Sequence, residues 1–375
     1  MSTASRRKSY AGPPMLRSGK LAALAGAAFL AMSGAVLAAE GDTIVMGTGA
    51  DIKTMCGDKP TVVGLSDGFG GDTWRKEVLA ELKDEASKCP NITKVLYTDG
   101  SGDPAKTNSD INSLVAQGVN VLIVFPDFGA AEIPAMRAAL QAGVIVVPYN
   151  GNPGGKNGQD YSYNVYQDFE KAAGKWAAWL NENLKEGTVL YFSGPAGNGF
   201  SANFNNGIKA ALTKYPKIKL LEDQWIATGW NPADAQKATA GVIAKYGKID
   251  AFMSDFGPVT IAVIRSFEQA GLPVPYVASL ASNNELNCMY LKAKGEGKAW
   301  PYMTLEGTTT QVRNALRRGL AEYQGTKNPD PLGMEAFIYA DSFKAHDPKC
   351  NSAAPPDADL SGLLTEEQQK KVFAQ

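Results

Sequence analysis

Residues 109–126 read SDINSLVAQGVNVLIVFP. The first part of this stretch belongs to a predicted helix from about Thr107 to Gln117, and the second part is a largely apolar run from Val119 to Phe125. A short Val, Leu and Ile run directly after a helix is typical of a strand that is buried on both faces. Such strands occur in parallel sheets that carry helices on both sides. The stretch therefore predicts one unit of an α/β fold.

The same alternation of helix and strand extends along the chain in both directions. Before this stretch, Thr61–Leu65 is strand-like, Trp74 opens a helix and residues 95–97 form an apolar run; after it, a helix over 132–141 precedes a strand over 144–147. Beyond Tyr163 the pattern starts again, with predicted helices over 169–184, 200–212, 233–244 and 259–270 and strands over 188–192, 218–221, 251–253 and 276–278. We therefore predict an α/β protein with two doubly wound, Rossmann-like lobes.

Each predicted strand ends in a polar, Gly-rich or aromatic stretch. These stretches cover residues 66–72, 126–128, 149–152, 193–198 and 254–257. Ligands of open parallel sheets collect beyond the carboxyl ends of the strands, because helix N-termini and exposed amides converge there. The stretches are therefore the candidate binding site. The alternative is ordinary turn chemistry, since Gly, Asn and Asp serve any tight connection.

The N-terminus has the pattern of an export signal. Five basic residues between Arg6 and Lys20 precede an apolar stretch from Leu21 to Val36, and small residues follow, so we expect a signal peptide over residues 1–38 that is cleaved after Ala38 or Ala39. The alternative is a membrane anchor, but the apolar stretch is shorter than the roughly 20 residues that span a bilayer. We expect an exported, periplasmic protein.

The charge and length of the processed chain narrow its function. Removing five basic residues and no acidic ones leaves 32 basic against 38 acidic residues, a net charge of −6. An acidic chain is not expected to bind nucleic acid or anionic lipid. The remaining length suits two domains. No other long apolar run is present in the sequence, so we expect contact with a membrane only through a partner.

The four cysteines all follow the predicted signal peptide, in a compartment that permits disulfides. Four cysteines allow three pairings, and we favour Cys56 with Cys89 and Cys288 with Cys350. The first pair would connect the segment before the first strand to the end of the first helix. The alternative is that the thiols are free and buried.

Several stretches resemble one known family. The order Val63-Gly64-Leu65-Ser66, then Trp74-Arg75 at a helix start, then residues 110–119 before Phe125-Pro126, is similar to the ribose- and galactofuranose-type periplasmic binding proteins. The resemblance implies the type I periplasmic binding protein fold, in which two lobes share three crossovers and close over a sugar. It implies a lobe over 57–164 plus 305–336, a lobe over 165–304 plus 337–352, and crossovers near Asn164, Leu305 and Ala336. We expect a tail over 353–375 that packs on one lobe, a monomer, and docking to the permease of an ATP-driven (ABC) importer.

The resemblance also implies ligand contacts. The family's contacts fall on Phe69, Trp74, Arg75, Asp127, Trp230 and Asp255, and the last of these is followed by Phe256. An indole face covers the C–H groups of a sugar while carboxylates and amides take its hydroxyls. For the tryptophans the alternative is a role as core residues.

The sequence departs from the family at three positions. Asn150-Gly151 replaces an Asp-Arg pair, Ala202 and Asn203 replace an Arg, and Ser279-Leu280-Ala281 replaces an Asp. The charged contacts are therefore mostly replaced by amides, with Asn150, Asn152, Asn198 and Asn203 as donors and acceptors. Of these, Asn150, Asn152 and Asn203 are the candidate ligand contacts. We predict a small, neutral, polyhydroxylated ligand, a sugar or a sugar-like molecule.

Other functional classes find little support in the sequence. His346 is the only histidine, so no His-based triad or His metal cluster can form, and no Gly-rich loop has a nucleotide-binding pattern. We therefore expect neither an enzyme nor a cofactor. Two alternatives remain: a ligand-binding partner of a membrane chemoreceptor or sensor kinase, and a binder of a small molecule that is not a sugar.

Overall fold

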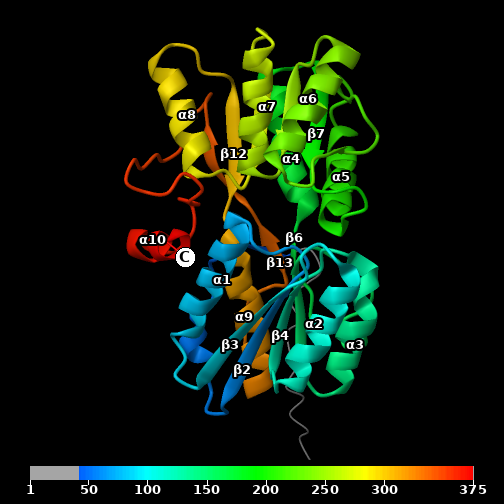
Figure 1. Cartoon of the computed structure of the whole chain (residues 1–375), viewed down its shortest axis with the longest axis vertical. Coiled ribbons are helices and arrows are strands. Elements are labelled where there is room, and N and C mark those ends of the chain that lie inside the picture. The colour runs from blue at the N-terminus through cyan, green and yellow to red at the C-terminus, as the bar shows by residue number, and fades with distance from the viewer. Residues whose placement is uncertain (1–41, 375) are drawn as a thin grey trace, which may run out of the picture. The chain divides into compact units, whose positions relative to one another are not determined.

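The structure is a computed structural model that describes residues 42–374, so the predicted signal peptide lies outside the described residues. Residues 42–374 form two seven-stranded sheets, and we call each sheet with its helices a lobe (Figure 1). The first sheet has the order β1-β13-β6-β5-β4-β2-β3, and all its strand pairs are parallel. The second has the order β14-β12-β11-β10-β7-β8, with β9 beside β7, and only β14 is antiparallel. The prediction of two doubly wound α/β lobes is confirmed.

The strands and helices have the following bounds. The first sheet comprises β1 (Thr43–Val45), β2 (Thr61–Asp67), β3 (Ile92–Asp99), β4 (Val121–Phe125), β5 (Ile145–Asn150), β6 (Val165–Gln167) and β13 (Gly333–Glu335). Its helices are η1 (Ile52–Thr54), α1 (Thr73–Ala86), α2 (Pro104–Ala116), η2 (Gly129–Glu132), α3 (Ile133–Gln141), η3 (Thr308–Thr310) and α9 (Gln311–Gln324). The second sheet comprises β7 (Gly187–Ser193), β8 (Ile218–Leu220), β9 (Ile226–Ala227), β10 (Ala251–Ser254), β11 (Tyr276–Leu280), β12 (Tyr302–Glu306) and β14 (Phe337–Asp341). Its helices are α4 (Phe169–Asn183), α5 (Gly199–Leu212), α6 (Pro232–Tyr246), α7 (Gly257–Gln269) and α8 (Asn284–Gly295), and α10 (Glu366–Phe373) follows in the tail.

Side-chain alternation along the buried strands explains why both faces of each sheet carry helices. In β4, Val121 and Ile123 pack with α1 and α9, whereas Leu122 and Val124 pack with α2 and α3. All five residues of β4 are buried. Strand β7 behaves in the same way, with residues 189 and 191 in the core of α4 and α5 and residues 190 and 192 in the core of α6 and α7. A strand with two apolar faces needs a helix layer on each side.

The chain passes between the two sheets three times. It leaves the first sheet after β6, returns after β12, and crosses again at Ala336, between β13 and β14. The range 165–167, which we had assigned to the second lobe, pairs with β5 and β13 in the first sheet. The helix that we predicted from Thr107 begins earlier, at Pro104, because the Asp103 carboxylate accepts from the backbone N–H groups of its first turn.

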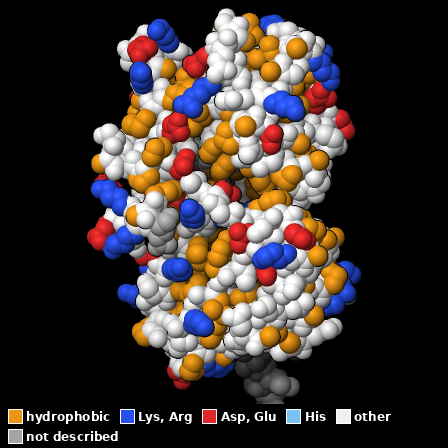
Figure 2. Space-filling model, viewed as in Figure 1, with side chains coloured by type: hydrophobic (Ala, Val, Ile, Leu, Met, Phe, Trp, Pro, Cys, Tyr) orange, Lys and Arg blue, Asp and Glu red, His pale blue; other side chains and the backbone are white. Residues whose placement is uncertain are grey.

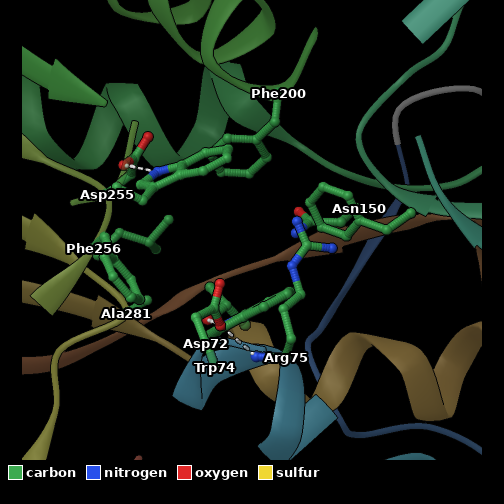
Figure 3. Close-up of a pocket in the computed structure, with 12 residues that line it drawn as sticks. Asp72, Trp74, Arg75, Asn150, Phe200, Asp255, Phe256 and Ala281 are labelled. Carbon is green, nitrogen blue, oxygen red and sulfur yellow. Dashed lines mark hydrogen bonds between the residues drawn. The ribbon is translucent and has the colours of Figure 1, made fainter. Parts of the chain in front are cut away.

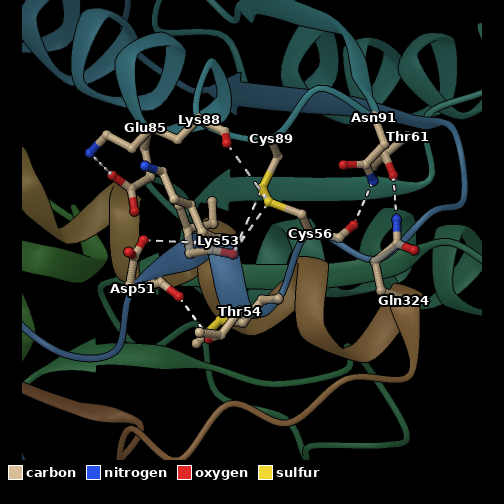
Figure 4. The surroundings of a disulfide bond; sticks show 12 residues. Asp51, Lys53, Thr54, Cys56, Thr61, Glu85, Lys88, Cys89, Asn91 and Gln324 are labelled. Carbon is tan, nitrogen blue, oxygen red and sulfur yellow. Dashed lines mark hydrogen bonds and ion pairs between the residues drawn. A yellow bond between two sulfur atoms is a disulfide. The ribbon is translucent and has the colours of Figure 1, made fainter.

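Both disulfides have the pairing that we favoured from the sequence. Cys56 is bonded to Cys89, with their Cα atoms 5.3 Å apart, and Asn91 Nδ2 donates to the Cys56 carbonyl at 2.6 Å (Figure 4). This bond connects the segment after η1 to the end of α1. Cys288 on α8 is bonded to Cys350, which holds the start of the tail on the second lobe.

The tail contacts both lobes, whereas we had expected it to pack on one. Asn284 of α8 donates to the carbonyl groups of Ala354 and Ala358 in the tail. Farther along, the Asp359 N–H donates to the Glu77 carboxylate at 2.9 Å, and Gln368 Nε2 donates to Asp84 at 2.6 Å, both on α1. The tail therefore runs from the second lobe to the first. None of the helices within residues 42–374 is long and apolar enough to cross a membrane.

Candidate functional site

A cavity lies where the two lobes meet. It comprises about 440 Å³ of space that is not filled by atoms, part of which is open to the solvent. The first lobe lines it with Asp72, Trp74, Arg75, Phe125, Asn150 and Thr308, and the second with Phe200, Trp230, Asp255, Phe256, Leu280 and Ala281 (Figure 3). The space-filling view shows hydrophobic side chains in the hollow between the lobes (Figure 2).

Most of the lining residues lie where strands end or helices begin. Phe125 and Asn150 are the last residues of β4 and β5, Leu280 ends β11, and Asp255 directly follows β10. Trp74 lies in the first turn of α1, which Asp72 caps by accepting from the Arg75 N–H at 2.8 Å. The cavity is thus at the carboxyl edge of both sheets, where a ligand of an open α/β sheet is expected.

The Arg75 guanidinium is held in place by two buried carboxylates. Its Nη1 lies 2.9 Å from Asp67 Oδ1 and its Nη2 lies 2.8 Å from Asp127 Oδ1. Asp127 also accepts from the Gly68 N–H at 2.9 Å. The guanidinium carbon lies 3.8 Å from the centre of the Phe125 ring, so the cation is fixed by charge on one side and by an aromatic face on the other.

Burial and proximity shift the pKa values of this cluster. Burial raises the pKa of Asp67 to about 7, although the nearby Arg75 charge opposes the shift. Burial also raises the pKa of Asp127, again against Arg75. For Arg75, burial alone would lower the pKa, but Asp127 and Asp67 hold it above its usual range. The positive charge of Arg75 is therefore already neutralised by groups within the protein.

Trp230 forms the wall of the cavity on the second lobe. Its indole N–H donates to Asp255 Oδ1 at 3.0 Å, and its ring centre lies 6.2 Å from that of Phe200 and 6.3 Å from that of Phe69. Asp255 also accepts from the hydroxyls of Tyr191 and Ser193 through Oδ2. Three donors from the protein thus fix this carboxylate and, through it, the orientation of the indole.

Gly194 makes room for the indole of Trp230. A Cβ atom at position 194 would lie 2.6 Å from the indole Cζ2, so a Gly194→Ala variant must displace the ring. We expect this variant to bind the ligand of the cavity at least about tenfold more weakly, which corresponds to about 1.4 kcal/mol. Titration calorimetry measures the change.

Gly241→Ala is the matched control for this substitution. Gly241 lies exposed on α6, and a Cβ there would meet nothing within 4 Å. This variant should keep the wild-type affinity, because alanine is favoured over glycine in a helix. Equal affinities of the two variants would contradict the role that we assign to Gly194.

Asp255 gives the protein a pH-dependent stability. Burial raises its pKa to about 6, against the hydrogen bonds from Ser193, Tyr191 and Trp230, whereas the value in the unfolded chain is about 3.8. Between these two values the folded state binds more protons than the unfolded state, so this group makes stability fall as the pH rises from 4 to 6. The loss, on the order of 3 kcal/mol, should be complete above pH 6 and absent below pH 4.

An Asp255→Asn variant isolates this contribution. An asparagine can accept from Trp230 through its oxygen and donate to the two hydroxyls through its amide. Urea denaturation from pH 4 to pH 7 measures the free energy of unfolding of both proteins. Because an asparagine does not titrate, we expect this free energy to decrease less with rising pH in the variant than in the wild type. Parallel pH profiles of wild type and variant would be incompatible with this assignment.

Two further groups are oriented toward the cavity by the first lobe. Trp74 donates its indole N–H to Thr308 Oγ1 at 2.9 Å, which fixes the plane of the ring. Asn150 has a φ of 66°, in the left-handed region that Asn tolerates better than most residues, and its Oδ1 accepts from Gln311 Nε2 at 3.2 Å. With Oδ1 engaged, the amide nitrogen of Asn150 is left as a donor for a ligand.

Six of the ten residues that the sequence indicated as ligand contacts line the cavity: Trp74, Arg75, Asn150, Trp230, Asp255 and Phe256. Their contact with a ligand stays a prediction. Asp127 lies behind Arg75 and is fully buried. Phe69 packs against Phe128 and Trp230.

Asn152 and Asn203 contact each other across the two lobes and do not line the cavity. Asn203 Nδ2 of the second lobe donates to the Asn152 carbonyl of the first at 3.2 Å. Asn198 Nδ2 similarly reaches the Asp127 carbonyl at 3.1 Å. These amides therefore form hydrogen bonds between the lobes. We had predicted that Asn152 and Asn203 contact the ligand, but neither lines the cavity.

The cavity also contains residues that we did not predict as contacts: Asp72, Phe125, Phe200, Leu280, Ala281 and Thr308. Phe125 and Phe200 lie within two residues of the strand-end stretches 126–128 and 193–198, so their position in the sequence could have indicated that they line the cavity. Thr308 follows a crossover, and no local pattern marks it. Within residues 42–374 no group of three or more His, Cys, Asp or Glu side chains could hold a metal ion.

The chain is similar in sequence to proteins that are named for the sugar or polyol they bind. The chain is 24% identical over 212 residues to a xylitol-binding protein of Mycolicibacterium smegmatis, covering 56% of this chain and 59% of that protein. It is 26% identical over 183 residues to a D-xylose-binding periplasmic protein of Escherichia coli, covering 48% and 54%. The matched part thus spans less than two thirds of these relatives.

The solved structures are similar in fold. A Caulobacter myo-inositol-binding protein superposes with a TM-score of 0.65 at 19% identity, over 76% of this chain and 95% of that protein. The family model described as the periplasmic binding protein domain matches residues 63–328, well over half of the chain. The chain with this cavity between two α/β lobes therefore belongs to the periplasmic binding protein domain family.

Proposed function

We propose that the chain is a periplasmic solute-binding protein that holds a small, neutral, polyhydroxylated ligand between its lobes and delivers it to the permease of an ATP-driven importer. The observation that carries this proposal is the cavity, because each lobe supplies six of its lining residues. A ligand there would contact both lobes at once. The named ligands of the relatives, xylitol, D-xylose and myo-inositol, are all neutral and rich in hydroxyls.

The aromatic and polar groups of the cavity suit a sugar or a polyol. Trp74, Phe200 and Trp230 offer ring faces and edges to C–H groups. Arg75 and Asn150 offer donors to hydroxyl oxygens. A carboxylate has about four lone-pair sites, and Asp255 uses three for protein donors, so it can accept from one further hydroxyl.

The electrostatics of the cavity argue against an anionic ligand. Arg75, its buried cation, is paired with Asp67 and Asp127, and Asp72 and Asp255 also line or adjoin the space. An incoming carboxylate or phosphate would meet more negative than positive charge and would lose its hydration without a free cation in return. A neutral ligand avoids this cost.

Lobe closure is the mechanism that this arrangement supports. A ligand that contacts both lobes stabilises the closed state by its differential affinity and shifts the equilibrium toward it. The hydrogen bonds from Asn203 to Asn152 and from Asn198 to Asp127 also join the two lobes, so they stabilise the same closed state. The permease would then recognise the closed protein.

A thermal-shift screen of the purified protein tests the proposal. The panel contains neutral sugars and polyols, sugar acids, and small amines. A ligand that binds only the folded state adds about 2.7 kcal/mol of stability at 100 times its Kd, so the melting temperature rises. We expect neutral polyhydroxylated compounds to raise it. A rise with acids or amines alone would contradict the proposed ligand class.

A further inference from the structure

One end of the cavity is apolar. Phe256, Leu280 and Ala281 form it, and Figure 3 shows Phe256 and Ala281 side by side, across the cavity from Arg75 and Asn150. Leu280 and Ala281 are buried at the end of β11, and Phe256 precedes α7. None of these three side chains can donate or accept a hydrogen bond.

The backbone around this apolar end is also engaged. The Ala281 N–H donates to the Leu305 carbonyl at 3.2 Å, and the Ala281 carbonyl accepts from the Gly257 N–H at 2.9 Å. The Phe256 carbonyl accepts from the Thr260 N–H at 2.9 Å and from its hydroxyl at 3.1 Å. A hydroxyl group placed against Ala281 would therefore find these backbone groups of Phe256 and Ala281 already paired, and would lose hydrogen bonds with water.

The opposite end of the cavity is polar. Asn150 keeps its amide nitrogen, and the Arg75 guanidinium has five N–H groups, of which single bonds to Asp67 and Asp127 use two. The space thus has a hydrogen-bonding end, and opposite it a wall of three side chains, Phe256, Leu280 and Ala281, that can only exclude water. A ligand that fits both ends must itself be asymmetric.

We infer that the ligand directs its hydroxyls toward Arg75 and Asn150 and places a carbon without a hydroxyl against Phe256, Leu280 and Ala281. This inference rests on the proposed function and names its substrate class: a terminally deoxygenated sugar or polyol, or a pentopyranose, whose ring methylene occupies the place of the hydroxymethyl-bearing carbon of a hexose. A buried methyl or methylene gains from the apolar wall, whereas an unpaired hydroxyl loses there.

Sugars that differ by one terminal group test this inference. Suitable pairs are D-fucose with D-galactose, L-rhamnose with L-mannose, and D-xylose with D-glucose. By titration calorimetry on the full-length processed protein, we expect the member without the terminal hydroxyl to bind at least about tenfold more tightly in every pair that binds. Equal or tighter binding of the hydroxylated member overturns the inference and leaves the proposed function intact. Failure of all six sugars to bind overturns the inference, and the thermal-shift screen then decides the proposed function.

An Ala281→Asn variant makes the test specific to this wall. Ala281 has a φ of 52°, and Asn is among the residues that tolerate this left-handed region, so the backbone can keep its conformation. The new amide would give a terminal hydroxyl a partner, and the preference within each pair should fall by about tenfold or reverse. An unchanged preference in the folded variant counts against the inference.

The control is Ala345→Asn, the same substitution at the same φ of 52° on an exposed turn. It should leave the preference unchanged, and a loss of preference there would overturn the assignment to Ala281. If Ala281→Asn does not fold, the wild-type comparison of the sugar pairs still decides the outcome.

Discussion

Replacing Arg75 by methionine is expected to lower the free energy of unfolding at pH 8 by about 3–5 kcal/mol. The substitution keeps most of the apolar volume but leaves Asp67 and Asp127, both fully buried, without their cation. Burial already holds the pKa of Asp67 at about 7 with Arg75 present, and removal of the cation should raise it further. Because the carboxyls can then take up protons, the loss should become smaller as the pH falls. Urea denaturation at pH 8 and pH 5 measures both effects.

Two controls isolate the buried pairs. In Arg265→Met the same substitution breaks an exposed ion pair with Glu285, and its cost should stay below about 1 kcal/mol. In the triple variant Arg75→Met, Asp67→Asn and Asp127→Asn no buried charge is left unpaired, so most of the stability should return. A loss below about 1 kcal/mol in Arg75→Met would show that the cluster does not hold the first lobe as described.

Replacing Trp230 by alanine is expected to weaken binding of the neutral ligand by at least about 30-fold, or about 2 kcal/mol. The variant removes an aromatic wall of the cavity and also one of the three donors to Asp255. Both losses act on the bound state. Titration calorimetry with the ligand from the thermal-shift screen gives the affinity.

Trp230→Phe separates the two contributions. Phenylalanine keeps an aromatic ring but has no N–H for Asp255, so its affinity should lie between those of wild type and Trp230→Ala. Trp300→Ala is a second control, which should keep the wild-type affinity, because Trp300 packs against Tyr290 and does not line the cavity. Wild-type affinity in Trp230→Ala would refute the assignment of this wall.

The sequence was informative wherever local pattern decides structure. The apolar run that ends at Phe125 is typical of a strand with two buried faces, and the position of Asp255 directly after another such strand predicted its place at the carboxyl edge of the sheet, where the cavity lies. The disulfide between Cys56 and Cys89 followed from the closeness of strand and helix ends in a strand-helix-strand unit. These inferences depend on neighbours in the chain.

The sequence was less informative about contacts between segments far apart in the chain. Asp127 has the predicted place after β4, but its carboxylate turns to Arg75, 52 residues earlier in the chain. Asn152 and Asn203 have side chains suited to a ligand, yet the approach of the two lobes brings them to each other. No local pattern reveals which partner a polar side chain meets across a lobe boundary. The tail was misjudged for the same reason, since its contact with Glu77 on α1 depends on the completed fold.

The central claim is that both lobes grip one ligand in the cavity between them. A crystal structure of the protein with the tightest neutral compound from the thermal-shift screen tests it directly. We predict ligand density that contacts Trp74 of the first lobe and Trp230 of the second at the same time. Density held by a single lobe, or bound outside the twelve residues that line the cavity, would contradict the account.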